Sequence, residues 1–178
     1  MEKEKRQKLT FKEAVEATPD VMTGYHEGIE AFGEYKSKIK VPEPSKIDGS
    51  LDIDDTTVKL YPDENRWDYA LCYDSEVFYI EVHSAITSEV SKMVKKLQWL
   101  KTWLATKAPE INKLTTTTKQ PYYWIQSSKC DIPKHMPQYK IIVQNKILPM
   151  PIWDYSKICK ICKRNLHFFC FFLSCWLV

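Results

Sequence analysis

The stretch RWDYALCYDSEVFYIEVHSA, residues 66–85, decides the fold. It contains two apolar runs separated by a short polar pair, Asp74 and Ser75, which is the pattern of a two-residue β-hairpin turn. With that turn, Tyr73 faces Glu76 and the pairing continues outward along both strands. The sequence therefore predicts a tight hairpin at the centre of a sheet.

This apolar hairpin also carries three ionisable side chains. The two-residue turn places Asp68 directly opposite Glu81, with their Cβ atoms about 4.5–5.5 Å apart. His83 lies two residues beyond Glu81 and shares its face of the sheet. A four-residue loop would place Asp68 opposite His83 instead and would keep all three side chains on one side.

Two facing carboxylates repel each other, and burying them unpaired costs more. A divalent cation, a shared proton or solvent at a sheet edge would offset that cost. A metal site is the sharper interpretation, because Mg²⁺ takes one or two carboxylates and leaves positions for water and phosphate oxygens. A solvated sheet face, with His83 bonded to a carboxylate, is the alternative.

The next segment, AITSEVSKMVKKLQWLKTWLAT, predicts a long amphipathic helix over residues 86–106. Thr87 or Ser88 is expected to cap its start, and Pro109 to stop its continuation. Its lysines form a basic face that can meet phosphates, although a solvated helix face has the same pattern. The apolar stripe is Ile86, Val90, Met93, Val94, Leu97, Leu100 and Leu104, and the lysines are Lys92, Lys95, Lys96, Lys101 and Lys107.

The remaining segments complete an α/β or α+β order, with a mixed sheet, a hairpin and flanking helices. We expect helices over 2–17 and 24–39, a loop over 41–50, a short edge strand over 51–54, a central strand over 121–128 and a strand or short helix over 139–150.

Three parts of the chain differ in composition: an N-terminal helical segment (1–23), an α/β core (24–150) and a hydrophobic, Cys-rich tail (151–178) that we expect to be poorly integrated. Tail residues 166–178 are almost entirely apolar but too few to cross a bilayer. The tail also resembles a zinc knuckle, but its last gap is too short and it has no glycine, so we do not expect zinc there. The candidate zinc ligands are Cys159, Cys162, His167 and Cys170.

Overall composition excludes some functions and favours others. The 178 residues carry a net charge of +3 and include four glycines, with no Gly-rich nucleotide-binding loop. The part of the chain after residue 60 holds most of the positive charge, a hint of an anionic partner such as nucleic acid. The charged N-terminus lacks the apolar core of a signal peptide, so we expect a cytoplasmic protein with reduced thiols and no membrane span.

Asp68, twelve intervening residues and then Glu81-Val82-His83 resembles the core motif of the PD-(D/E)XK restriction-endonuclease-like nucleases. The resemblance implies metal-dependent cleavage of phosphodiester bonds, with Asp68 and Glu81 binding Mg²⁺ or Mn²⁺ and the third position orienting or activating water. Trp67 stands where that family has Pro, and His83 where it has Lys. The chain also resembles an uncharacterised bacterial group through NRWDY, EVH and KLQWLKTWL.

The family's lysine supplies a fixed positive charge that histidine lacks, although His83 can act as a base or metal ligand near neutral pH. A lysine of the following helix can take that role. The upstream helix glutamate of the family corresponds to one of three residues that the sequence does not distinguish. The candidate lysines are Lys92, Lys95 and Lys96, and the candidate glutamates are Glu27, Glu30 and Glu34.

We therefore expect a metal-dependent nuclease-like protein acting on DNA or RNA, or a descendant without full catalysis, with catalytic residues Asp68, Glu81 and His83. Lys92, Lys95 and Lys96 are the expected nucleic-acid contacts. The alternative is a non-enzymatic module that binds a protein or nucleic acid through the basic helix 86–106. Its Trp99 and Trp103, one turn apart, can stack on bases or belong to the core, and Asp52 and Asp54 are further candidate metal carboxylates or a solvated sheet edge.

Overall fold

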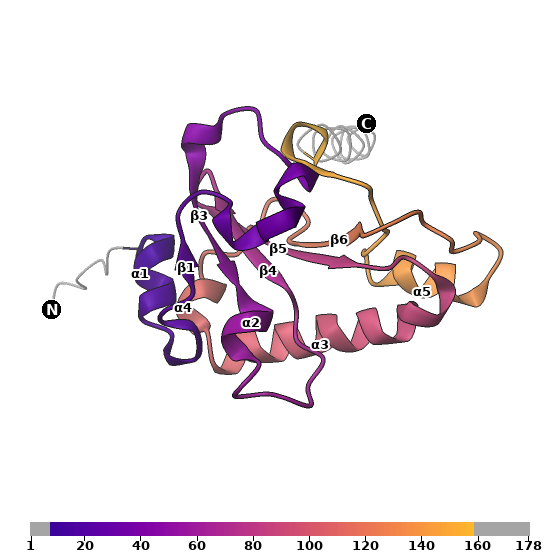
Figure 1. Cartoon of the computed structure of the whole chain (residues 1–178), viewed down its shortest axis with the longest axis horizontal. Coiled ribbons are helices and arrows are strands. Elements are labelled where there is room, and N and C mark those ends of the chain that lie inside the picture. The colour runs from indigo at the N-terminus through magenta and orange to yellow at the C-terminus, as the bar shows by residue number, and fades with distance from the viewer. Residues whose placement is uncertain (1–7, 159–178) are drawn as a thin grey trace, which may run out of the picture.

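A five-stranded mixed sheet forms the centre of the protein (Figure 1). The computed structural model describes residues 8–158. The strand order is β1-β3-β4-β5-β6, and all neighbours are antiparallel except β5 and β6, which are parallel. The predicted mixed sheet with flanking helices is confirmed. The strands are β1 (Tyr25–His26), β3 (Ile47–Asp52), β4 (Tyr69–Tyr73), β5 (Glu76–His83) and β6 (Tyr122–Gln126).

The hairpin between β4 and β5 has the predicted turn. Tyr73 pairs with Glu76, so Asp74 and Ser75 are the two turn residues. Their φ angles are 53° and 60°, and positive values at both positions are those of a type I′ turn, whose twist matches that of the strands. The Ser75 N–H also donates to Asp48 Oδ2 at 2.9 Å, which ties the turn to β3.

Side chains of the sheet alternate between two cores. On β5, Val77 and Tyr79 pack into the core beneath the long helix α3, which we call the helix-side core. Phe78 and Ile80 pack into the core on the other face, the opposite core. By the same alternation Glu81 belongs to the helix side, so a carboxylate occupies a position where the strand otherwise buries hydrophobic side chains.

The helix α3 (Val90–Thr106) connects the parallel strands β5 and β6 and covers the helix-side face (Figure 1). It follows the short 3₁₀ helix η4 (Thr87–Glu89) and ends before Pro109. The predicted cap by Thr87 or Ser88 is wrong, because no side chain caps either helix. The helix buries Val90, Met93, Lys96, Leu97, Leu100, Trp103 and Leu104, which confirms most of the predicted stripe and adds a lysine to it.

Short helices and one pair of short strands surround the sheet. The first helix starts later than predicted, at a capping box in which the Thr10 N–H and the Glu13 N–H each bond to the other residue's side chain. These elements are α1 (Phe11–Glu16), η1 (Pro19–Val21), η2 (Glu30–Lys38), η3 (Pro44–Lys46), α2 (Ile53–Thr57), α4 (Pro109–Asn112) and α5 (Pro137–Gln144), with β2 (Ile39–Lys40) parallel to β7 (Trp153–Asp154).

The helix predicted over 24–39 is confirmed only in part, as a 3₁₀ helix over its second half. The segment begins as strand β1 and continues as η2, whose backbone breaks at Gly33 with φ 50°. Tertiary contacts override the helical spacing: the Ala31 N–H donates to Ser50 Oγ at 3.2 Å, and Phe32 is fully buried in the opposite core. The segment therefore covers the sheet face that α3 leaves free.

The predicted edge strand over 51–54 is also corrected. Strand β3 starts earlier, at Ile47, inside the predicted loop, and lies within the sheet because β1 pairs with its outer side. Asp52 ends it and caps α2, accepting a hydrogen bond from the Asp55 N–H at 2.8 Å. The alternation of 51–54 therefore marks a strand-to-helix junction rather than an exposed strand.

Strand β6 lies at the end of the sheet, not at its centre as predicted. Its outer edge is covered by Met150, which donates to Trp124 O and accepts from the Gln126 N–H, both at 2.9 Å. Trp124 and Tyr123 are buried on opposite faces. An end strand buried on both faces and paired along its outer edge has the aromatic composition expected of a central one.

The boundary predicted at residue 150 is corrected as well. Trp153 is fully buried in the opposite core together with Tyr155 and Ile158, so residues 151–158 belong to the fold. The segment 139–150, predicted as a strand or a short helix, contains most of the helix α5. The predicted zinc ligands from Cys159 onward lie outside the described residues. Within 8–158, no helix has the length and apolar character needed to cross a membrane.

The type I′ turn generates a stability prediction. Ser75→Gly should raise the free energy of unfolding by about 0.5–1 kcal/mol, because glycine adopts positive φ without steric cost and the backbone bond to Asp48 is kept. Urea unfolding followed by circular dichroism measures it. The control Ser91→Gly, at an exposed position inside α3, should lower the free energy by a similar amount; destabilisation by both changes would contradict the turn assignment.

Candidate functional site

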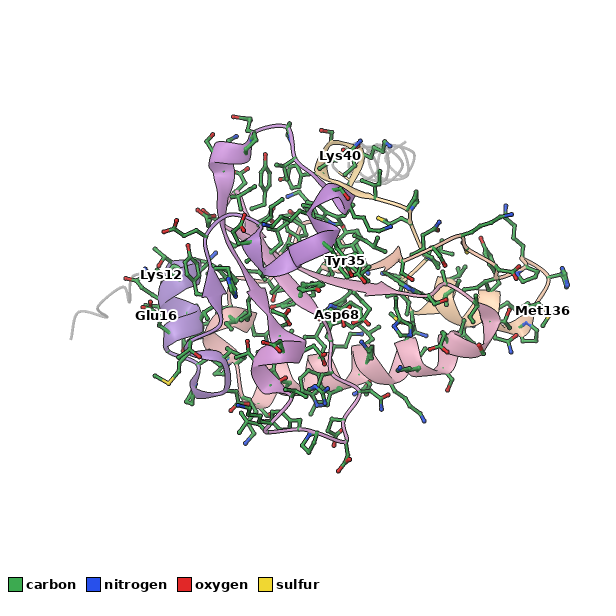
Figure 2. The ribbon with its side chains drawn as sticks, viewed as in Figure 1. Lys12, Glu16, Tyr35, Lys40, Asp68 and Met136 are labelled. Carbon is green, nitrogen blue, oxygen red and sulfur yellow. The ribbon has the colours of Figure 1, made fainter. Side chains whose placement is uncertain are left out.

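One ammonium group and two carboxylates meet between the sheet and α3. Lys96 Nζ donates to Asp68 Oδ1 at 2.9 Å and also to Glu81 Oε1. The other two carboxylate oxygens accept backbone N–H groups, Glu81 Oε2 from Asp68 at 3.0 Å and Asp68 Oδ2 from Val82 at 2.9 Å. Figure 2 shows Asp68 in this region, between the strands and α3. We call Asp68, Glu81 and Lys96 the acidic cluster.

The hairpin register and the helix phase build this cluster. The last paired residues of β4 and β5 are Tyr69 and Ile80, so the next residues outward, Asp68 and Glu81, become neighbours as predicted. Lys96 reaches them because it lies on the buried stripe of α3 rather than on its outer face. The sequence prediction left three lysines open, and the structure selects this one.

Burial controls the charges of the cluster. The side chains of Glu81, Lys96 and Asp68 are 0%, 10% and 17% exposed. Burial, followed by the charge of Asp68, raises the pKa of Glu81 well above its usual range, and Lys96 opposes that rise. Burial also disfavours the ammonium form of Lys96, but the two carboxylates outweigh it and raise the pKa of Lys96. The cluster therefore sets two carboxylates against one ammonium group. Of its three side chains, that of Asp68 is the most accessible to solvent.

His83 lies at the edge of the cluster. Its Nδ1 is 3.9 Å from Glu81 Oε1, and its Nε2 is hydrogen-bonded to Glu89 Oε2 at 2.7 Å. The hydrogen bond with His83 lowers the pKa of Glu89, and this effect is larger than the opposing effect of burial. Glu89 was not predicted; the signal that could have revealed it is a carboxylate at the start of the helix that follows His83. The imidazole is therefore oriented between two carboxylates.

The predicted lysine contacts divide into two groups. Lys92 and Lys95 are exposed on the outer side of α3 and remain candidate nucleic-acid contacts. Lys96 is not part of that exposed basic face, because its amine is held by Asp68 and Glu81. The correction has a simple cause: adjacent helical residues differ by about 100° in direction, so the run of lysines cannot share one face.

The two carboxylates of the acidic cluster are of the donor type that a divalent cation takes, although Lys96 Nζ already bonds to one oxygen of each. Asp68 and Glu81 offer two carboxylates, and Mg²⁺ commonly takes one or two from a protein and completes its shell with water and phosphate oxygens. Each carboxylate oxygen accepts one N–H and keeps a second lone pair. Within 8–158 no group of three or more His, Cys, Asp or Glu side chains is arranged to hold a metal, so among these residues Asp68 and Glu81 would be the ligands.

The other predicted acids do not join the cluster. Asp52 pairs in register with Tyr69, whose ring packs on the opposite core, so Asp52 faces away from the helix side. Asp54 is bonded to Arg66 Nε at 2.8 Å. Of the upstream glutamates, Glu30 forms an ion pair with Lys36. Glu27, Glu30 and Glu34 lie in or beside the segment that covers the opposite face.

The contacts of the acidic cluster predict that Lys96, but not its neighbour Lys95, contributes strongly to the free energy of unfolding. Lys96→Met should lower the free energy of unfolding by about 3 kcal/mol, because it leaves a fully buried carboxylate unpaired. Lys95→Met, one residue earlier and exposed, should change it by no more than about 0.5 kcal/mol. Adding Glu81→Gln to Lys96→Met should restore part of the lost stability. Urea unfolding of the unmodified protein, the two single variants and the double variant measures these changes. Equal losses for Lys95→Met and Lys96→Met would contradict the cluster.

Asp52 predicts a pH dependence. Burial, with the charges of Asp55, Asp68 and Asp54 adding to it, raises the pKa of Asp52 from 3.8 to about 6. The folded state then holds a proton that the unfolded chain releases between these values, so the free energy of unfolding falls as pH rises through that window and the penalty persists above it.

Asp52→Asn should therefore raise the free energy of unfolding at pH 7.5 by about 1 kcal/mol, a figure reduced for solvent screening, and by less at pH 4. Asparagine keeps the cap on α2. Urea unfolding at both pH values measures the effect. The exposed control Asp63→Asn should be neutral at both, and a uniform gain for Asp52→Asn at both pH values would contradict the pKa shift.

The chain was compared with protein-family models, with curated proteins and with solved structures. None of the three comparisons found a match.

Proposed function

We propose that this domain is a metal-dependent nuclease-like protein that cleaves phosphodiester bonds in DNA or RNA. One observation carries the proposal: a single buried lysine amine contacts both hairpin carboxylates. Asp68, Glu81 and Lys96 together supply the two acids and the fixed positive charge that the PD-(D/E)XK resemblance implies, with the lysine placed on the following helix instead of the strand.

The residues of the cluster suit this chemistry in distinct ways. Asp68 and Glu81 would hold the cation, which when bound supplies positive charge at the phosphate. Lys96 contributes a charge that does not depend on proton exchange near neutral pH and can stabilise the negative charge that develops on the phosphate. His83, oriented by Glu89, would act as the base that takes a proton from the attacking water.

A second candidate is the non-enzymatic binding module. One observation favours it: every oxygen of the two carboxylates already accepts a hydrogen bond from the protein, and Glu81 has no solvent exposure. In this second candidate the cluster would hold α3 on the sheet and would take no part in chemistry. The basic outer side of α3 would then bind the partner.

Cleavage assays separate the two functions. The purified chain is incubated with Mg²⁺ or Mn²⁺ and single- or double-stranded DNA and RNA, beside Asp68→Asn and Glu81→Gln. We expect cleavage that each substitution lowers at least about 100-fold, since each removes a carboxylate that would hold the cation beside the reacting phosphate. The exposed control Glu16→Gln should keep full activity.

Cleavage that survives both substitutions would show that the acidic cluster is not the active site. Absence of cleavage with every metal and substrate, by a chain that still binds nucleic acid, would select the second candidate. Circular dichroism of each variant confirms that the loss is not one of folding.

A further inference from the structure

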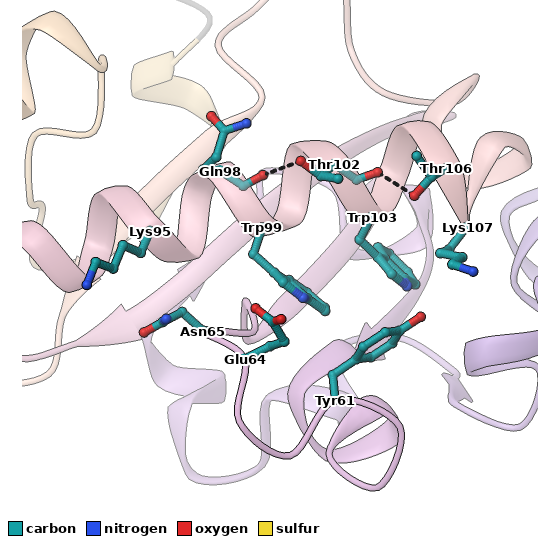
Figure 3. A pocket seen from close by; sticks show the side chains of 10 residues that line it. All are labelled: Tyr61, Glu64, Asn65, Lys95, Gln98, Trp99, Thr102, Trp103, Thr106 and Lys107. Atoms are coloured by element: carbon teal, nitrogen blue, oxygen red, sulfur yellow. Dashed lines mark hydrogen bonds between the residues drawn. The ribbon is translucent and has the colours of Figure 1, made fainter.

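An aromatic groove runs along the outer flank of α3 (Figure 3). It lies between the helix and the loop that follows α2 and has a volume of about 520 Å³. Aromatic rings form its floor, and lysines stand near its two ends. The residues that matter for its chemistry are Tyr61, Glu64, Lys95, Trp99, Trp103 and Lys107.

The floor of the groove is fixed before any ligand arrives. Trp99 and Trp103 are stacked, with centroids 5.9 Å apart and planes 8° apart, and the Tyr61 ring meets Trp99 edge-on at 5.7 Å. Tyr61 Oη and Trp103 Nε1 both donate to Asp20 Oδ2, at 2.6 and 3.0 Å. Two polar anchors therefore hold the ring cluster in place, and little conformational entropy would be lost on binding.

The two tryptophans differ in accessibility. Trp103 is buried, with 3% of its surface exposed, whereas Trp99 is only partly buried. Trp103 lies beside Trp99 with its ring nearly parallel. Trp99 is therefore the ring that can offer surface to a ligand, and Trp103 supports it from behind.

The charges along the groove favour an anionic ligand. Lys95 and Lys107 are twelve residues apart, which places them about 18 Å apart along the helix axis. Glu64 is the acidic side chain of the lining, so the lining carries a net single positive charge. An extended chain with a planar group between anionic groups matches this layout, and a few nucleotides of a single strand have that chemistry.

The groove and the acidic cluster share the same two segments of chain. On α3, Lys95 lines the groove and Lys96 belongs to the cluster. On the other side, Asn65 lines the groove three residues before Asp68. A single nucleic-acid strand lying along the groove would therefore have its Lys95 end beside the chain segments that carry the cluster.

We propose that this groove binds single-stranded nucleic acid, with one base stacked on Trp99 and phosphates beside Lys95 and Lys107. The inference rests on the proposed function and names its substrate as a single strand. A duplex is excluded as the preferred ligand, because its bases are stacked within the helix and cannot lie against an indole ring.

Binding is measured without cleavage, using the full chain carrying Glu81→Gln and fluorescein-labelled oligonucleotides, single-stranded and duplex, by fluorescence anisotropy. The single strand should bind more tightly. Trp99→Leu should weaken it at least about 10-fold, as loss of a base-stacking ring does, whereas Trp99→Phe should retain much of the affinity. Lys95→Gln should weaken binding and lower its salt dependence by about one phosphate contact. The exposed control Lys134→Gln should change nothing.

The outcomes distinguish this inference from the proposed function. Equal affinity for the duplex, or affinity insensitive to Trp99→Leu and Lys95→Gln, would show that the groove is not a nucleic-acid site. That result is expected if the groove binds a protein instead. The cleavage assay would still test the nuclease activity independently. If the chain binds the single-stranded oligonucleotide in a way that depends on Trp99 but cleaves no substrate, the groove is supported and the nuclease function is rejected.

Discussion

The ammonium group of Lys96 is the constraint on which the site depends. It joins the only long helix among the described residues to the central hairpin through two carboxylates, one of them fully buried. Without that charge, Glu81 would face hydrophobic surroundings with the partial support of one backbone N–H. This contact fixes which turn of α3 lies over the two acids, whose spacing the hairpin register sets.

A buried ion-pair cluster holds a helix on a sheet at a high desolvation cost. Desolvating three charged groups offsets much of their mutual attraction, and hydrophobic residues of similar volume would stabilise the same place as well or better. Tyr79 on β5 and Ala70 on β4, the inner neighbours on the same face, are such residues. An arrangement with this desolvation cost supports the proposed function, and burial and helix phase fix which lysine takes part.

Sequence reasoning reached the hairpin, the long helix and the proximity of Asp68 and Glu81, because alternation, turn chemistry and helical period are local signals. It did not choose among the three lysines, since that requires the rotation of α3 on the sheet. The partnership of His83 with Glu89 was missed because it joins two elements. The 3₁₀ segment near Gly33 and the end position of β6 depend on contacts from distant parts of the chain, which local patterns do not contain.

The opposite core has a consequence for how the protein is cut or joined to others. Trp153, Tyr155 and Ile158 close the sheet face that carries Phe78 and Ile80, although they come late in the chain. A chain ending near residue 150 would leave part of that face as an uncovered apolar surface and would free the partner of β2. Self-association of such a fragment through uncovered rings would then follow. Fusion junctions and shortened versions therefore belong after residue 158.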